Sequence, residues 1–243
     1  MAQAASAPVL SIVVPVYNEA RTVAAVIDRL MTVPFPVARE VLVVDDGSTD
    51  GTGDILKQFD GRRDISVLVA ARNQGKGAAI RRGIDRAKGR ILAIQDADLE
   101  LDPGQLPALV QPVVDGRAQA VYGSRFLGGR PEMPFVSRCA NRALTAITNV
   151  VCGGHVTDME TCYKIVPTDV LRSLRLESDR FDIEAEITAK LLLRRCTITE
   201  LPIVVHSRSK AAGKKIGWRD GVNAVRAILR YGVKERRAIK SFD

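Results

Sequence analysis

The sequence predicts an α/β fold, a doubly wound and mostly parallel sheet with helices on both faces, plus a basic amphipathic C-terminal helix. Short apolar, β-branched segments alternate with segments of helical spacing through the first half of the chain, as in a series of βα units. The apolar segments carry few polar residues on either face, which is typical of strands buried between two helical layers. The chain of 243 residues is 46% hydrophobic and 26% charged, which fits one ordinary globular domain.

The elements can be placed in order along the chain. Apolar runs predict strands at residues 9–16, 41–44, 65–69 and 91–94. Helical spacing between these runs predicts helices at residues 21–31, 54–59 and 78–87. No repeat or low-complexity linker interrupts the series, so we expect one compact domain without a second core.

The predicted C-terminal helix has the pattern of a basic amphipathic helix. Such a helix commonly lies on an anionic bilayer surface. The alternative is a helix that packs on the domain and leaves its arginines in solvent. Its apolar face comprises Trp218, Val222, Val225 and Leu229, and Arg219, Arg226, Arg230 and Arg237 lie on its other sides.

The net charge of +8 is concentrated near the C-terminal end, where residues 208–240 hold eleven Lys or Arg residues against Asp220 and Glu235. A basic segment of this kind indicates a polyanionic partner, either nucleic acid, an acidic membrane surface or a phosphorylated substrate. The chain has few aromatic residues for base stacking, and its basic stretch lacks the interleaved aromatic residues that are typical of nucleic-acid-binding segments. We therefore expect no nucleic-acid partner.

Cysteine usage and the N-terminal sequence bear on the compartment. The four cysteines form no Cys-x-x-Cys pair and there are two histidines, which argues against a zinc site and a disulfide framework. The first eight residues have no basic or apolar region of a signal peptide, and the longest apolar run is far too short to span a membrane. These features predict a cytoplasmic protein whose attachment to a membrane, if any, is peripheral.

Polar residues follow each of the four predicted strands at the same end. The segments are residues 15–19, 45–48, 72–77 and 95–98. Because the carboxyl ends of parallel strands meet at one edge of a sheet, where ligands bind, these residues should lie close together. The repeated placement is the strongest indication of a functional site from the residues alone.

Asp96 and Asp98 flank a small residue directly after a buried strand. Two carboxylates this close repel each other unless a cation lies between them or one is protonated. A divalent ion held by one or two carboxylates and by substrate phosphate oxygens would explain the pair; a helix cap plus a solvated acid is the alternative. Glu100 is a further candidate, as a third ligand or a residue that holds water.

Two other strand ends carry candidate binding groups. Asp45 and Asp46 exceed what a turn or a helix cap requires, and we expect Asp46 to accept a hydrogen bond from a nucleobase ring N–H. The Gly75-Lys76-Gly77 turn opens a predicted helix, so its backbone N–H groups and Lys76 could approach a phosphate or ribose. The chain lacks both the dinucleotide fingerprint and a P-loop, so dehydrogenase and P-loop NTPase functions are disfavoured.

Together these motifs resemble those of family 2 glycosyltransferases, in the family's order and spacing. Within the family, the sequence is most similar to polyprenyl-phosphate sugar synthases of the dolichol-phosphate mannose synthase type. The motifs are VPVYNE (14–19), VVDDGSTDGT (43–52), RNQGKG (72–77) and DAD (96–98), and the resemblance continues through GSR (123–125), VSRCAN (136–141), ELPI (200–203), Arg208 and GKK (213–215).

The resemblance implies a GT-A fold over residues 1–243, with a nucleotide-sugar-binding half (1–123), an acceptor-binding half (124–205) and a basic loop and helix (206–243). It implies an inverting transfer of a hexose from a nucleotide diphosphate sugar, of the GDP-mannose or UDP-glucose type, to a polyprenyl phosphate at the cytoplasmic membrane face. The implied donor-binding residues are Pro15, Tyr17, Glu19, Asp46, Lys76 and Asp96; the ligands of Mg²⁺ or Mn²⁺ are Asp96, Asp98 and Glu100; the acceptor-binding residues are Arg125, Arg138, Arg208 and Lys214; and Asp98, Arg125 and Arg138 are the implied catalytic residues.

The acceptor chemistry leaves one alternative open. A lipid phosphate is already an anion at neutral pH, so it needs cationic groups rather than a general base. A hydroxyl of a sugar or small soluble acceptor would need a carboxylate base, and Asp158 and Glu160 are the candidates. Their segment departs from the usual mannose-synthase pattern, which leaves the transferred sugar open. Glu186, in the acidic segment of residues 180–186, could face the site or could lie on the surface of a helix.

Overall fold

The computed structural model describes residues 7–62, 64–129, 131–206 and 218–240, and for residues 218–220 and 233–240 it describes the backbone. Seven strands form one sheet in the order β3-β2-β1-β4-β6-β5-β7. All neighbouring strands are parallel except β6, which is antiparallel to both β4 and β5. The strands are β1 (Leu10–Val16), β2 (Arg39–Asp45), β3 (Ile65–Val69), β4 (Ile91–Ile94), β5 (Ala120–Ser124), β6 (Lys164–Pro167) and β7 (Ile198–Pro202).

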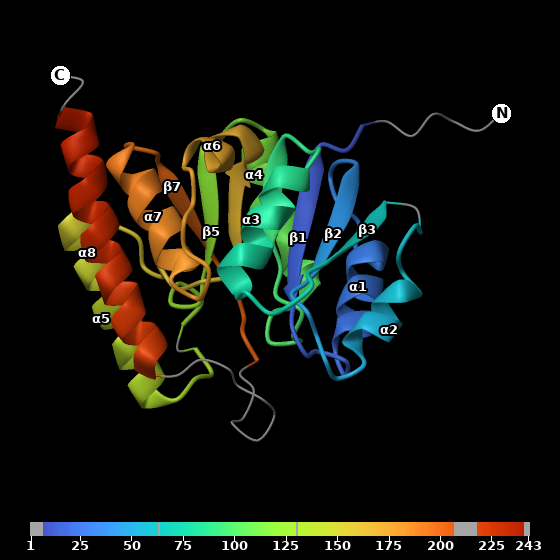
Figure 1. The fold of residues 1–243 in the computed structure, drawn as a ribbon. Coiled ribbons are helices and arrows are strands. Elements are labelled where there is room, and N and C mark those ends of the chain that lie inside the picture. The colour runs from blue at the N-terminus through green and yellow to red at the C-terminus, as the bar shows by residue number, and fades with distance from the viewer. Residues whose placement is uncertain (1–6, 63, 130, 207–217, 241–243) are drawn as a thin grey trace.

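Helices connect the strands and cover both faces of the sheet (Figure 1). The chain moves outward from β1 through β2 to β3 and then crosses back to β4. Because such parallel crossovers are right-handed, α1 and α2 lie on the face opposite α3. The helices are α1 (Val23–Thr32), α2 (Thr52–Lys57), α3 (Lys76–Arg86), α4 (Leu106–Val114, after the 3₁₀ turn Pro103–Gln105), α5 (Phe135–Cys152), α6 (Thr168–Ser173), α7 (Ile183–Leu193) and α8 (Trp218–Lys240).

These elements confirm the predicted α/β fold and each of the four strands in the first half. The parallel register aligns the strand ends that carry the polar motifs, because Val16 of β1 lies beside Asp45 of β2 and Val13 lies beside Ile94 of β4. The four residues of β4 are all buried, as expected for a strand between two helical layers. The sheet therefore places its polar residues along one edge.

The expectation of a single core is wrong. A second cluster of buried apolar residues lies between α5, α7 and α8, apart from the main core around the sheet. In Figure 1 these three helices form a separate layer at one end of the sheet, beyond β7. Its central members are Leu144, Met159, Ala185, Ala189, Ala224, Ile228 and Tyr231.

Helix α8 confirms the predicted C-terminal helix, and it packs mainly through residues next to the predicted apolar stripe. Ala224, Ile228 and Tyr231 are buried, and α8 contacts both α5 and α7. Val222 and Leu229 remain 40% and 48% exposed. Val225 of the predicted stripe packs against the second core, so the exposed Val222 and Leu229 form the edge of one broad apolar surface. No described helix is long and apolar enough to cross a membrane.

Candidate active site

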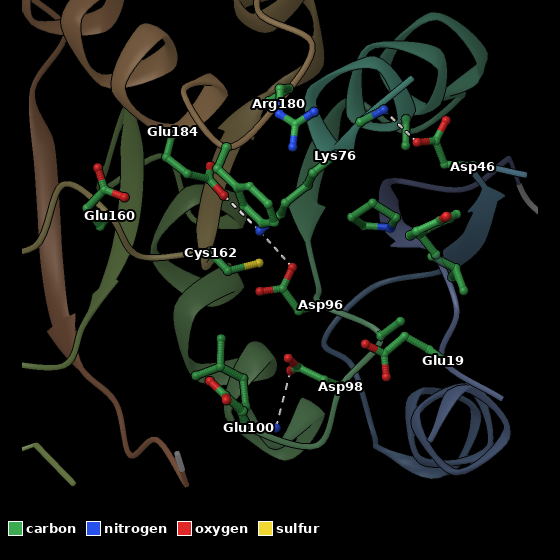
Figure 2. Close-up of a pocket in the computed structure, with 18 of the residues that line it drawn as sticks. Glu19, Asp46, Lys76, Asp96, Asp98, Glu100, Glu160, Cys162, Arg180 and Glu184 are labelled. Atoms are coloured by element: carbon green, nitrogen blue, oxygen red, sulfur yellow. Dashed lines mark hydrogen bonds and ion pairs between the residues drawn. The ribbon is translucent and has the colours of Figure 1, made fainter. Parts of the chain in front are cut away.

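A cavity of about 330 Å³ opens at the carboxyl ends of the strands, within the size range of small-ligand pockets. Figure 2 shows acidic and basic side chains from both halves of the chain around it. The cavity brings together most of the residues predicted from the sequence. They are Pro15, Tyr17, Glu19, Asp46, Lys76, Asp96, Asp98, Glu100 and Arg125.

One predicted acceptor residue, Arg138, is not among the described residues that line the cavity. Arg138 lies on α5, where its guanidinium stacks on the ring of Phe135 at 5.3 Å. Phe135 is 67% exposed, so this pair is at the surface. Arg208 and Lys214 lie outside the described residues. The roles of these three residues toward an acceptor stay predictions.

The last residue of β2, Asp45, and the residue after it, Asp46, both stabilise nearby loops, which the sequence did not reveal. Asp45 accepts hydrogen bonds from the backbone N–H and the hydroxyl of Ser48, which closes the turn. The carboxylate of Asp46 accepts the backbone N–H groups of Gln74 and Gly75 at 2.6–3.0 Å. Asp46 therefore fixes the loop before α3. A carboxylate has further lone pairs, so its predicted contact with a nucleobase stays a prediction.

The Gly75-Lys76-Gly77 turn is built for close packing against another segment. A side chain at Gly75 would collide with the backbone of Asp179, and one at Gly77 would collide with that of Ser178. The backbone N–H of Ala78 donates to the carbonyl of Asp179 at 3.1 Å. Because both positions are glycines, the segment before α7 can pack directly on the start of α3 and cover it.

Lys76 lies at the centre of the cavity and joins its two halves. Its ammonium is 2.7 Å from a carboxylate oxygen of Asp96 and 2.9 Å from one of Glu184 (Figure 2). Burial by itself lowers the pKa of Lys76, but the charges of Asp96 and Glu184 outweigh it, and its pKa is raised well above the usual value. Lys76 is therefore a permanent cation, held by two acids rather than projecting freely toward a nucleoside.

The predicted metal ligands share the cavity, with Asp98 beside Glu100 and Asp96 turned toward Lys76 (Figure 2). The backbone N–H of Glu100 donates to Asp98 at 3.3 Å. Among the described residues, no group of three acidic, histidine or cysteine side chains is preassembled for a metal ion. The fit is instead that of a hard ion bound by one or two carboxylates and completed by oxygens of its substrate.

Arg125 follows β5 and reaches the other wall of the cavity. Its guanidinium makes two hydrogen bonds of 2.7 Å to the carboxylate of Asp158, and its backbone N–H makes a third at 3.0 Å. Although burial lowers the pKa of Arg125, these contacts outweigh it and raise the value. Asp158 is fully buried and both of its oxygens are engaged. Of the two candidate bases, Asp158 is thus committed to Arg125.

Glu160 is the candidate base that does line the cavity. Burial, followed by the charge of Glu184, raises its pKa to about 7. Lys164 donates to the backbone carbonyls of Met159 and Thr161 on either side of it. The segment that carries Glu160 is therefore fixed in place, and its carboxyl group titrates near neutral pH.

The acidic segment of residues 180–186 contributes Glu184, from the first turn of α7, to the cavity. Both alternatives for Glu186, a place in the site and a place on a helix surface, are wrong. Glu186 is fully buried, accepts the backbone N–H groups of Glu177 and Ser178, and pairs with Lys190 at 2.6 Å. Glu184 points to Lys76 instead. The sequence also did not single out Cys162 and Arg180, which line the cavity. No motif marks these residues. The contact between α3 and the segment before α7 brings in Arg180, and Cys162 comes from the segment before β6.

Solved structures define the class of fold. Glucosyl-3-phosphoglycerate synthase from Mycobacterium tuberculosis, in complex with phosphoglyceric acid, matches with a TM-score of 0.70 and 23% identity, over 92% of this chain and 80% of that chain. Mannosyl-3-phosphoglycerate synthase from Rubrobacter xylanophilus matches with a TM-score of 0.70 and 18% identity, over 96% and 75% of the two chains. The chain therefore belongs to the class of proteins with the GT-A fold.

The sequence identifies the family within this class. Residues 11–175 match the model of glycosyl transferase family 2, and the chain belongs to that family. The dodecaprenyl-phosphate galacturonate synthase of Rhizobium johnstonii is 31% identical over 84% of this chain and 61% of its own length. The dolichol-phosphate mannosyltransferase of Pyrococcus furiosus is 24% identical over 86% of this chain and 59% of its own length. The chain thus spans about three fifths of these relatives.

Proposed function

We propose that this glycosyltransferase transfers a hexose, with inversion, from a nucleotide diphosphate sugar to the phosphate of a polyprenyl lipid. The observation that carries the proposal is the cavity with acids that suit a metal–diphosphate at one wall and Arg125 at the other. Both relatives described above are named for polyprenyl-phosphate or dolichol-phosphate sugar transfer. A phosphate acceptor needs a cation beside the reacting centre rather than a base.

The donor would lie along the strand ends, with its nucleoside between Tyr17 and Asp46 and its diphosphate at Asp96 and Asp98. These two acids, with Glu100, would hold Mg²⁺ or Mn²⁺, which supplies Lewis-acid stabilisation of the leaving diphosphate. Solved structures of the M. tuberculosis enzyme contain Mn²⁺ or Mg²⁺ together with UDP. Lys76 adds a fixed positive charge next to Asp96, where charge develops on the leaving group.

The acceptor phosphate would meet Arg125, whose side chain Asp158 holds in one orientation. Arg138, Arg208 and Lys214 are further cations that we assign to the acceptor side. Arginine presents a planar fork of donors that matches phosphate oxygens. Binding of the lipid at the cytoplasmic face would place α8 against an anionic surface, with the exposed Val222 and Leu229 toward the lipid.

A second candidate function is transfer to a hydroxyl group of a small soluble acceptor. One observation favours it: Glu160 lines the cavity with its pKa raised to about 7 by burial and by Glu184, as a general base near neutral pH would require. The solved M. tuberculosis structure contains phosphoglyceric acid, a hydroxyl-bearing compound of this kind.

Incubation with labelled UDP- and GDP-sugars, with Mn²⁺, and with either polyprenyl phosphate or phosphoglyceric acid separates the two candidates. Under the proposed function, label enters the organic phase only with the lipid phosphate, as a product sensitive to EDTA. Label that stays in water and appears only with phosphoglyceric acid would contradict the lipid proposal and support the hydroxyl acceptor.

A further inference from the structure

A second cavity, of about 310 Å³, lies where α3 packs against α6 and the segment that follows it (Figure 1). It shares no described lining residue with the active-site cavity. Lys76 and Ala79 of α3 line the active site, whereas Ala78 and Arg82 line the second cavity. At helical spacing these two pairs point to different sides of α3. A ligand in the second cavity would therefore not occupy the active site.

Arginine dominates the charge of this second cavity. The charged residues that line it are Arg81, Arg82, Arg172, Arg175 and Asp85. Of the acids close by, Asp179 pairs with Arg81, and Glu177 pairs with Arg230 of α8 at 3.1 Å. Even when Asp85 and Asp179 are both counted against the four arginines, two positive charges remain. Like charges gathered in this way repel each other unless an anion lies among them.

Two of the arginines hold the walls of the second cavity together. Arg172 donates to the backbone carbonyls of Ile84 and Ala87 at the end of α3, at 3.0 and 2.6 Å. Arg81 donates to the carbonyl of Leu176 at 3.3 Å. The Nε atom of Arg81 is nevertheless buried without a hydrogen-bond partner among the described residues. A buried donor in this state indicates an acceptor that the chain itself does not supply.

The other two arginines are not used by the fold in this way. Neither Arg82 nor Arg175 makes a side-chain hydrogen bond or an ion pair with a described residue. Arg175 has a φ of 49°, a left-handed conformation that glycine or asparagine adopts more readily. The backbone at this turn therefore does not call for an arginine, and its charge faces the cavity without a counter-ion.

We propose that the second cavity is a binding site for a phosphate group, separate from the active site. Arg82 and Arg175 bind the phosphate oxygens, and the free Nε of Arg81 is a third donor. Guanidinium groups suit this ligand, because their planar forks match the geometry of phosphate oxygens. The group is carried either by a small soluble phosphate or by a phospholipid headgroup. The inference does not depend on the proposed function.

A bound phosphate links two segments that also form the active site. Arg82 lies on α3, and Arg175 lies on the segment that leads through Asp179 to α7. The backbone N–H of Ala78 already donates to the carbonyl of Asp179. A phosphate between Arg82 and Arg175 adds a second connection between the same segments, so it stabilises the folded chain.

Calorimetry of the full chain tests the site. The probes are inorganic phosphate and pyrophosphate, without a nucleotide sugar and without divalent metal, so that the acids of the active site do not gather them. We expect saturable binding by the wild type and a rise in its melting temperature with either probe. Arg82→Gln and Arg175→Asn should each weaken binding roughly tenfold or more, because each removes a charge-assisted contact.

A matched control comes from another arginine in the same backbone conformation. Arg195 has a φ of 57° and lines neither cavity. Arg195→Asn therefore makes the same change of charge and of backbone preference elsewhere, and it should bind both probes as the wild type does. Circular dichroism melts establish that each variant is folded. Asparagine accepts the left-handed conformation, so Arg175→Asn should melt no earlier than the wild type.

Vesicles distinguish the two sources of the phosphate. Phosphatidylcholine vesicles are made with phosphatidic acid, which exposes a phosphate monoester, or with phosphatidylglycerol at the same surface charge. If the source is a headgroup, the wild type prefers phosphatidic acid, and Arg175→Asn but not Arg195→Asn loses the preference. If the source is soluble, the vesicles show no preference, while pyrophosphate binding still depends on Arg175. Either result supports the site.

Three results would overturn the inference. The first is wild-type affinity for pyrophosphate in both Arg82→Gln and Arg175→Asn, which would place the ligand elsewhere. The second is an equal loss in Arg195→Asn, which would make the effect one of overall charge. The third is a wild type that binds neither phosphate, pyrophosphate nor phosphatidic acid vesicles. None of these measurements uses sugar transfer, so each result leaves the proposed function untouched.

Discussion

The two walls of the cavity are built in different ways. One wall, which we call the donor wall after its proposed role, takes Asp46 and Asp96 from the residues just after β2 and β4. Backbone N–H groups hold Asp46, and Lys76 pairs with Asp96. The opposite wall takes Glu160 from the segment before β6 and Glu184 from the first turn of α7, and buried ion pairs hold it together. A backbone hydrogen bond survives most side-chain changes, whereas a buried ion pair leaves an uncompensated charge when one partner is lost. A substitution at the donor wall should therefore lower activity with little loss of stability, whereas one at the opposite wall should lower both.

The largest effect is expected at the donor wall, from Asp98→Asn. The change removes a proposed metal-binding charge with little change in volume, so transfer should fall by roughly a thousandfold. The melting temperature should stay close to that of the wild type. Activity assays with Mn²⁺, with and without EDTA, and thermal melts check both parts. Near-normal turnover in the variant, or turnover that EDTA does not reduce, would remove the metal from the mechanism.

At the opposite wall, Arg125→Ala should damage both activity and stability. Loss of a charge-assisted contact to phosphate should lower acceptor kcat/KM by roughly ten- to a hundredfold. The fully buried Asp158 would lose its partner, which should cost about 3 kcal/mol of unfolding free energy. Steady-state kinetics with polyprenyl phosphate and urea denaturation measure the two effects.

Arg138→Ala is the matched control for this coupling. The guanidinium of Arg138 stacks on an exposed ring, so its loss should leave the unfolding free energy within about 0.5 kcal/mol of the wild type. Acceptor use should still fall if Arg138 binds the acceptor phosphate. Equal destabilisation by the two variants would mean that the pair with Asp158 is not what links Arg125 to stability.

The pH dependence of stability should reveal the raised pKa of Glu160. Burial, and then the charge of Glu184, raise its pKa to about 7 in the folded protein, while Lys164 and Arg125 oppose this and Asp158 adds to it. Because the folded state binds this proton more tightly than the unfolded state, stability falls as pH rises between about 4.5 and 7. The wild type should lose about 2 kcal/mol relative to Glu160→Gln between pH 5 and pH 8. Urea denaturation at both pH values tests this, and parallel curves would place Glu160 in a more polar environment.

The smallest expected effect concerns α8, whose arginines are outside both walls. Arg226→Gln should weaken binding to anionic vesicles by about 1 kcal/mol, roughly fivefold. Arg230→Gln should have a smaller effect, because Arg230 already pairs with Glu177 at 3.1 Å. Vesicle sedimentation across salt concentrations measures both. As a control, turnover of a short water-soluble prenyl phosphate should be unchanged in either variant. If neither change weakens vesicle binding, α8 is only a packed surface helix.

The sequence by itself determined the fold class, the first four strands and the residues of the donor wall. The reason is that each strand of a buried parallel sheet is a continuous apolar run, and the polar residues that follow it must lie at one edge. Asp96 and Asp98 are therefore visible as a motif, and the cavity does include both. The assignment of Asp46 to a nucleobase overlooked that its carboxylate holds the backbone of residues 74–75.

Only the tertiary structure decided the opposite wall and the second core. Residues 183–191 of α7 are all buried, so the helix has no polar face that could indicate whether Glu184 or Glu186 points into the cavity. The antiparallel strand β6 lies between β4 and β5. It pairs with β4 from about 70 residues away in the sequence and with β5 from about 40 residues away. Short-range periodicity carries no information about such pairing, because it depends on which distant strand edges are left free.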